Sequence, residues 1–458
     1  MFDALEEKYP CYAVLNDLED CAIRATHGLG HKGETMLRQL LIKTCRIDQV
    51  VTWSIVSILS FTSVNAYALP AFARQTGQNC VACHAGGQFP ELTPYGRLFK
   101  LTGYTIGQRA LPLSMMAVLT ANKVKVNDPA AGHTQDGTPI FNTASLFIAG
   151  KISDKTGGFV QITYNNYAGD TGFEGHTSSD NLDLRYADRF INDKQDLIYG
   201  LTLHNNPGVQ DVWNSTPAWG YGVVPGSTGA GSAITPMLDG GLAQQVAGIG
   251  GYAYWNKTVY AELTGYRTGD GIFSFMTQGN GGQLRIKGTN PYLRLALTHE
   301  WGPHNAMIGV SHLDVRQYPD PVNLSAVTDR YRDNSIDFQY QYLLDPHTFT
   351  ATVTRIHENI DYGTPGNLPD TVNSLRAKAS YTYQAKYGAS LSYFDVSNSA
   401  NTFAAQAGAR GWTPEIFWMP LQHVRTGLQY TLFNADSAAS NPKARDNNTL
   451  LFYVWVTY

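Results

Sequence analysis

Residues 374–383 read SLRAKASYTY, a stretch in which apolar or aromatic side chains alternate with polar or charged ones. In an extended strand, one face would carry leucine, alanine and tyrosine, and the other would carry Arg376 and Lys378. The same alternation returns in VYAELT (259–264) and YLRLALT (292–298). Such two-faced strands occur in transmembrane β-barrels and also in soluble β-sandwiches.

The lengths of the connections favour the barrel. Seven short turns are expected, at 153–158, 192–196, 256–257, 301–305, 345–347, 385–388 and 420–423. Between them lie eight longer polar or Gly-rich stretches, at 127–139, 168–181, 206–244, 268–290, 316–331, 358–371, 395–410 and 435–448. Strict alternation predicts an all-β fold of 16 antiparallel strands over residues 110–458, with short periplasmic turns and long external loops.

The end of the chain and the composition agree with an outer-membrane barrel. Residues 450–458 (LLFYVWVTY) alternate and close on Tyr458, which resembles the assembly signal of outer-membrane proteins. The 27 Tyr and 8 Trp suffice for two interfacial girdles. A net charge of −4 argues against a nucleic-acid partner. Runs of about 20 apolar residues, which a bundle of membrane helices needs, do not recur.

The first 68 residues resemble a leader rather than a domain. A basic flank precedes the apolar stretch 50–64, and Ala66 and Ala68 form a small-x-small cleavage site. We expect a signal peptide over 36–68, begun at Met36, and a mis-assigned start over 1–35. The alternative is a membrane anchor, although the apolar stretch is shorter than the roughly 20 residues that span a bilayer.

Two of the five cysteines stand in CVACH (80–84), the attachment motif of a c-type haem. Cys80 and Cys83 would bond the porphyrin covalently, and His84 would ligate the iron. The sequence therefore predicts one covalently bound haem c. The alternatives are a disulfide, a redox dithiol or half of a zinc site, and no second pair of zinc ligands follows at matching spacing.

The flanks of this motif predict a short helix. Thr93 suits its N-cap, Pro94 its first turn and Gly103 its C-cap, which places a helix over 94–102. Three aromatic side chains are placed to pack on a porphyrin or simply in a core: Phe89, Tyr95 and Phe99.

The whole module, 69–109, is too small to enclose a haem unaided. We therefore expect the barrel to wall it in. Lumen-facing Arg376, Lys378 and Arg425 offer cations for haem propionates or for acidic residues of the plug, the alternative being an ordinary hydrated lining.

FARQTG (72–77), CVACH and the downstream PELTPYGR (90–97) resemble the monohaem cytochrome–porin fusions, which include outer-membrane iron oxidases. Similarity returns in GLQYT (427–431) and DNNTL (446–450). The resemblance implies a 16-stranded barrel plugged by a small cytochrome. It also implies Cys80, Cys83 and His84 as haem residues, without fixing Fe(II) as the donor.

The sixth iron ligand is open in the sequence. Met115 and Met116 stand where the first strand begins, and either one could reach the iron or simply pack in the wall. The register of this strand is ambiguous. His204 and His299 alternate with apolar neighbours and are weaker candidates for lumen-facing groups.

Three functions are compatible with these features. The leading hypothesis is an electron-transfer cytochrome in the bacterial outer membrane, with the haem module entering from the periplasmic side. It would link an extracellular donor to a periplasmic cytochrome or cupredoxin, as an Fe(II):cytochrome c oxidoreductase if the donor is iron. The alternatives are a diffusion porin with a structural or gating haem and a soluble periplasmic cytochrome. Detergent-dependent extraction excludes the last, and a channel closed to solutes excludes the porin.

Overall fold

The computed structural model describes residues 70–87, 90–126, 137, 139–165, 176–216, 234–278, 284–402, 408–436 and 443–458. The expected start at Met36 and signal peptide 36–68 lie outside these residues. Everything described below belongs to one compact unit, Leu69–Tyr458. Of the helices within the described ranges, none is long and apolar enough to cross a membrane.

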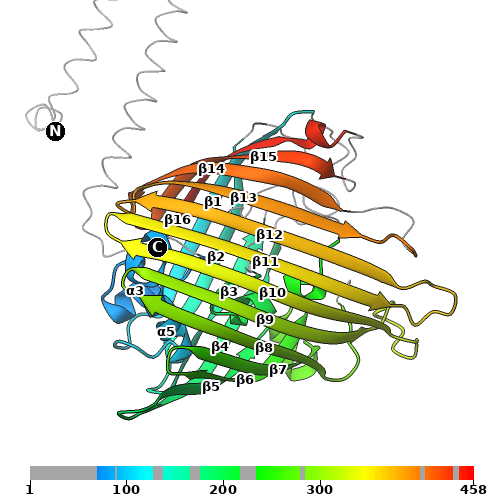
Figure 1. Cartoon of the computed structure of the whole chain (residues 1–458), viewed down its shortest axis with the longest axis horizontal. Coiled ribbons are helices and arrows are strands. Elements are labelled where there is room, and N and C mark those ends of the chain that lie inside the picture. Colours follow the sequence, from blue (N-terminus) through cyan, green and yellow to red (C-terminus); the bar gives the residue numbers. More distant parts are fainter. Residues whose placement is uncertain are drawn as a thin grey trace, which may run out of the picture. The chain divides into compact units, whose positions relative to one another are not determined.

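The described residues form a closed antiparallel barrel of 16 strands, which confirms the predicted fold class and strand number (Figure 1). The strands are β1 Leu113–Val124, β2 Ile140–Lys151, β3 Thr156–Asn165, β4 His176–Ile191, β5 Asp196–His204, β6 Val246–Trp255, β7 Val259–Thr268, β8 Asn290–Trp301, β9 His304–Gln317, β10 Asp329–Leu344, β11 His347–Asp361, β12 Asp370–Tyr383, β13 Tyr387–Asn398, β14 Ala409–Leu421, β15 Val424–Asp436 and β16 Thr449–Thr457. Each pairs with its neighbours in sequence. The barrel closes where β1 meets β16, with Val118 opposite Trp455.

Short and long connections alternate as the sequence predicts. Residues 256–258 join β6 to β7 and 302–303 join β8 to β9, whereas β7 and β8 are separated by 269–289. Asn256 and Lys257 both have positive φ, 49° and 52°. Two successive residues of this kind form the tight turn whose twist matches a β-hairpin. The short turns define one end of the barrel, which we call the short-turn end.

The two faces of the wall differ in polarity. Outward side chains are large, apolar and exposed all around the barrel, as at Leu201, Leu263, Leu295, Ile308, Leu391, Ile416 and Phe452. Inward side chains are largely polar and buried, as at Thr264, Arg294, Asp337, Gln339, Thr354 and Glu415. This is the polarity of a barrel that spans lipid around a polar interior. The polar face of 374–383 lies inside, as predicted.

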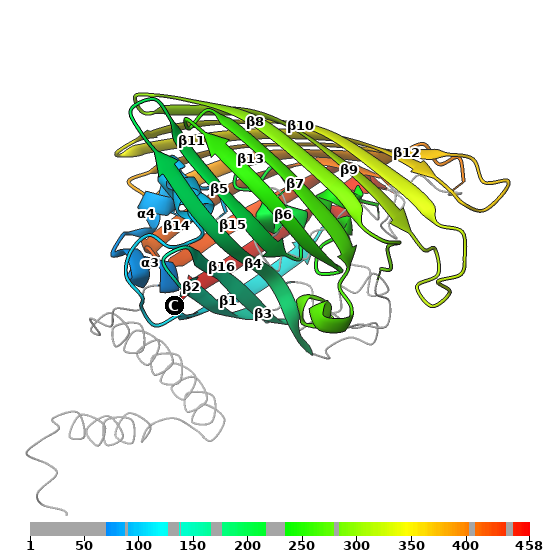
Figure 2. The same cartoon turned by 90° about the horizontal axis from the view of Figure 1, so that it is seen from below.

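A small helical module precedes β1. It contains α3 (Ala71–Thr76), α4 (Cys80–Cys83), the 3-10 turn η1 (Ala85–Gly87) and α5 (Pro94–Leu101). These helices lie at the end of the barrel that holds the C-terminus (Figures 1 and 2). Further short helical turns lie in the long connections: α6 Pro207–Gln210, η3 Met237–Gly241, η4 Gly271–Met276 and η5 Ala444–Asn447.

Candidate functional site

The CVACH motif forms a single helical turn followed by an extended residue. Cys80 and Cys83 begin and end α4, and the backbone of His84 turns extended, with φ −116° and ψ 128°. An isolated bridge pairs His84 with Leu92, which returns the chain beside the motif. The Cys80 and Cys83 thiols are free and are not joined in a disulfide. That these residues bind haem stays a prediction.

The helix after the motif begins as predicted. The hydroxyl of Thr93 caps α5 by accepting a hydrogen bond from the Gly96 amide at 3.1 Å, and Pro94 takes the first turn. The Thr93 amide also donates to the Cys83 carbonyl at 2.9 Å. Gly103 follows with φ 71°. The cap therefore fixes α5 directly against the haem-motif turn.

Gly96 lets α5 approach α4 closely. A Cβ atom at this position would lie 2.1 Å from the Cys83 carbonyl oxygen and 2.9 Å from its carbonyl carbon. Backbone atoms cannot move aside as the tip of a flexible side chain can. The glycine in PYGR is thus explained by the backbone of the haem motif and not by a turn.

We expect Gly96→Ala to separate α4 from α5. Overpacking of this kind costs about 1–3 kcal/mol, and the strain falls on the residue that carries a thiol. The measurement is a urea titration followed through the absorbance of the haem that the motif predicts, which should lose its native spectrum at lower urea. Gly251→Ala is the control, because there the nearest atom to the added methyl lies at 3.6 Å. Equal midpoints for the two variants would refute the close-contact argument.

A cavity of about 250 Å³ lies between the module and the barrel wall. From the module, it is lined by Cys80, Cys83 and His84. Its other walls include aromatic and apolar side chains from the module and from β1, β2, β3 and β16, namely Phe72, Phe99, Tyr104, Met116, Phe147, Phe159 and Trp455. An apolar cavity with few polar groups is typical of a cofactor site.

Burial controls the protonation of the motif. Desolvation lowers the pKa of His84 to about 4, outweighing the opposite effect of Glu91, so the imidazole is neutral near pH 7. A neutral imidazole is the form that ligates iron. Burial, and then the charge of Cys80, raises the pKa of Cys83 to about 11. Within the described residues, no cluster of three or more His, Cys, Asp or Glu side chains is placed to hold a metal ion.

The structure separates the two methionines that the sequence could not. Met116 is 4% exposed and faces the interior of the barrel, whereas Met115 is 53% exposed and its side chain faces outward. Met116 packs with Val118, Tyr453 and Trp455. Of the sequence candidates for the sixth ligand, Met115 is therefore on the wrong face of the wall.

Of the aromatic residues predicted to pack near the haem motif, one lines the cavity and another does not. Phe99 is 4% exposed and lines the cavity, with its ring 5.0 Å from that of Phe72 and 5.7 Å from that of Tyr104. Tyr95 is not among the lining residues. Phe89 lies outside the described residues.

The module contacts the inner wall in several directions. Arg97 of α5 is buried and donates to Asn305 of β9 at 2.5 Å and to Gln339 and Gln341 of β10, both at 3.1 Å. The Tyr252 hydroxyl of β6 donates to the Leu101 carbonyl at 2.5 Å. These contacts place α5 within the barrel at its short-turn end, as the sequence predicts for the module.

One predicted lumen cation pairs with the module. The Lys378 ammonium lies 2.9 Å from the Glu91 carboxylate, which confirms the expectation of an acidic plug partner. Arg376 instead pairs with Asp239 of the β5–β6 connection at 2.6 Å. Arg425 pairs with a residue of the wall itself, Glu415, at 2.7 Å. The three cations are thus engaged by three different parts of the chain.

A buried polar network ties the module to β4. Asp183 accepts a hydrogen bond from the Tyr104 hydroxyl at 2.5 Å and lies 3.9 Å from the Lys100 ammonium. Its strand neighbour Arg185 contacts it at 3.0 Å and donates to the Gln210 carbonyl at 2.5 Å. Asp183 and Arg185 are 0% and 1% exposed. The strand and the module therefore meet at the Asp183 carboxylate, and Arg185 beside it reaches the β5–β6 connection.

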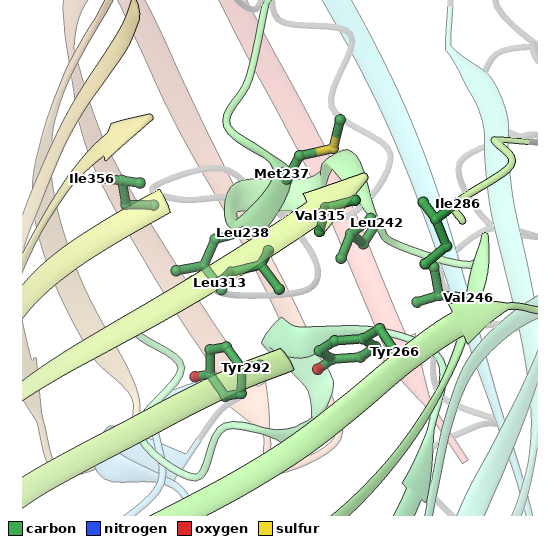
Figure 3. Close-up of a cluster of buried hydrophobic side chains, with 10 residues drawn as sticks. All are labelled: Met237, Leu238, Leu242, Val246, Tyr266, Ile286, Tyr292, Leu313, Val315 and Ile356. Carbon is green, nitrogen blue, oxygen red and sulfur yellow. The ribbon is translucent and has the colours of Figure 1, made fainter. Parts of the chain in front are cut away.

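The β5–β6 connection turns inward, which corrects the expectation of an external loop over 206–244. Most of its first described stretch, up to residue 216, is buried: Val212 is 0% and Trp213 1% exposed. Asp211 lies 3.4 Å from Arg294 of β8. Near the connection's other end, Leu238 and Leu242 pack in the apolar cluster of Figure 3. Residues 217–233 lie outside the described ranges.

The connection also contacts the module. The Lys100 ammonium donates to the carbonyl of Val209 and, at 3.0 Å, to that of Asp211. The Asn214 amide donates to the Pro90 carbonyl at 2.5 Å. Sequence reasoning missed these residues, and the one available signal was the apolar content of a segment assumed to be external, with Val212 and Trp213 at its start.

The two histidines noted in the sequence lie in different environments. His204 is buried and lies 2.9 Å from the Tyr266 hydroxyl. His299 is on the outer face, stacked on Trp301 at 5.3 Å, so the expectation of a lumen position was wrong for it.

No family model matches the chain, and no curated protein does. The cytochrome–porin resemblance therefore stays a prediction. Among solved structures, the chain is similar to the outer-membrane channel DcaP of Acinetobacter baumannii, with 13% identity, TM-score 0.47 and coverage of 76% of this chain and 96% of that one. It is also similar to a loop-deletion mutant of OmpT of Vibrio cholerae (8%, TM-score 0.45, 76% and 98%). A third is an anion-selective porin from Comamonas acidovorans (11%, TM-score 0.42, 76% and 98%).

Proposed function

We propose that this chain is an outer-membrane electron-transfer protein that holds one haem c inside a porin-like barrel. Cys80 and Cys83 would bond the porphyrin covalently, and His84 would ligate the iron. The observation that carries the proposal is the cavity that these three residues share with the barrel wall. The apolar outer face of the wall supports a location in the outer membrane.

The residues that line the cavity have the chemistry needed to hold a haem. Two thiols one helical turn apart and the next imidazole face one apolar cavity, and the lining rings can pack on a planar macrocycle. A bound haem would supply a one-electron Fe(III)/Fe(II) couple. The protein's own part is to orient that couple and to keep water from it. Arg97, Lys100 and Glu91 serve this by fixing the module within the wall.

The position of the haem within the membrane is the physical reason for placing it inside a barrel. The hydrocarbon core is about 30 Å thick, and a redox centre inside the barrel shortens the distance from each surface. We propose that an extracellular donor, Fe(II) in the case of an iron oxidase, passes electrons to a periplasmic cytochrome or cupredoxin.

A diffusion porin with a structural or gating haem is the second candidate. The strand number and the polar lumen favour it. The filling of the lumen by the module and the β5–β6 connection favours the conduit. Stopped-flow oxidation of the reduced, detergent-solubilised protein by a periplasmic-type cytochrome tests the difference. Oxidation at a rate that rises with acceptor concentration is expected, and a haem inert to donors and acceptors would leave only the porin.

The orientation in the membrane gives a further prediction. We expect a cysteine at Val322, which is 87% exposed in the β9–β10 connection, to react with an impermeant maleimide on intact cells. A cysteine at Asp154, whose side chain is 95% exposed in a short turn, should react only after the cells are lysed. The physical reason is that long loops face outward and short turns face the periplasm. The reverse labelling would invert the topology.

A further inference from the structure

We infer that Met116 supplies the sixth ligand to the iron, an inference that rests on the proposed function. Met116 and His84 line the same cavity, one from the barrel wall and one from the module. A thioether is one of the few side-chain groups that ligate haem iron together with histidine. The wall of the barrel, rather than the haem module, would then complete the coordination.

The pairing of β1 fixes where Met116 lies. It stands opposite Ser145 of β2 and Thr457 of β16, near the start of β1, the strand that follows the module. The alternation of burial along β1 turns this side chain inward and turns Met115 outward. Met115 also borders the cavity, but its side chain is 53% exposed. Because side chains in a strand alternate with a period of two, only the thioether of Met116 turns into the barrel interior.

Three other polar side chains that line the cavity are already engaged. The Lys100 ammonium donates to the carbonyls of Val209 and Asp211. The Tyr104 hydroxyl donates to Asp183 at 2.5 Å, and the Asn214 amide donates to Pro90 at 2.5 Å. A thioether, by contrast, is a soft donor that needs no hydrogen bond to be stable in an apolar site.

The surroundings of Met116 set the direction of its effect. Val118, Tyr453 and Trp455 pack around it. Methionine ligation raises the potential of a histidine-ligated haem, and an apolar shell acts in the same direction by disfavouring the extra charge of the ferric state. A high potential suits a conduit that accepts electrons from a weak reductant such as Fe(II).

The test compares Met116→Leu with Met115→Leu in the full-length, haem-loaded protein. Both remove a thioether and keep a large apolar side chain. Met116→Leu should lose the low-spin spectrum, bind carbon monoxide in the reduced state and shift the midpoint potential downward. Met115→Leu should match the wild type in all three readouts.

Met116→His provides the second variant, because an imidazole restores a strong ligand. It should keep the low-spin spectrum and exclude carbon monoxide while its midpoint potential falls below that of the wild type. A Met116→Leu protein with a low-spin haem, no carbon monoxide binding and the wild-type potential would overturn the ligand assignment. That result would leave the haem and its electron transfer intact. A wild-type protein without covalent haem would instead overturn the proposed function.

Discussion

Replacing both Cys80 and Cys83 by alanine should abolish the haem signal on a denaturing gel. A haem held only by its axial ligand leaves the chain when the fold is lost, whereas thioether bonds survive denaturation. Each thiol lines the cavity from one end of α4, so each single change should leave one bond and weaken the signal. The measurement is the peroxidase stain for haem, scaled to the amount of protein.

The double variant should still form the barrel, since neither thiol belongs to a strand. Mobility on an unheated gel, which differs between a folded and an unfolded barrel, checks this. Val81→Ala is a matched control: the residue lies between the cysteines, and its side chain is 42% exposed. A stain that persists in the double variant would refute the attachment site.

Replacing Asp183 by alanine should loosen the module from the wall. The change leaves Lys100 and Arg185 buried without their carboxylate, and it removes the acceptor of the Tyr104 hydroxyl. Removing one partner of a buried ion pair costs about 3–5 kcal/mol. We expect the module to dissociate at lower urea, and liposomes containing the variant to swell in sucrose because the lumen opens.

The control for this change lies on the same strand. Asp188 pairs with Lys155 at 2.5 Å, but the Lys155 side chain is 52% exposed. Asp188→Ala should therefore leave both the urea transition and the sucrose barrier close to those of the wild type, as expected for an exposed ion pair. If Asp183→Ala behaved like Asp188→Ala, the module would not be held by this carboxylate.

The parts of the fold predicted from the sequence are those with a local signal. Polar and apolar positions alternate in 374–383, so the inward face of β12 follows from the two-residue period of a strand. The haem motif is equally local, because its thiols and imidazole lie within CVACH. Thr93 and Pro94 mark the start of α5 for the same reason.

The parts that the sequence did not predict depend on contacts between distant residues. In LSMMAV (113–118) both central residues are apolar, so the pattern does not determine which methionine faces inward. That choice comes from pairing with β16 at the other end of the chain. The β5–β6 connection turns inward because Asp211 meets Arg294 and Asp239 meets Arg376, pairings that one sequence alone does not reveal.

The central claim is that electrons cross the membrane through this barrel while solutes do not. The direct measurement uses liposomes that carry the purified protein, with oxidised cytochrome c sealed inside and dithionite added outside. We predict that the enclosed cytochrome c becomes reduced in wild-type liposomes that do not swell in sucrose, and stays oxidised in liposomes carrying the Cys80→Ala, Cys83→Ala protein. Enclosed cytochrome c that stays oxidised although the wild-type protein carries its full haem would contradict the account.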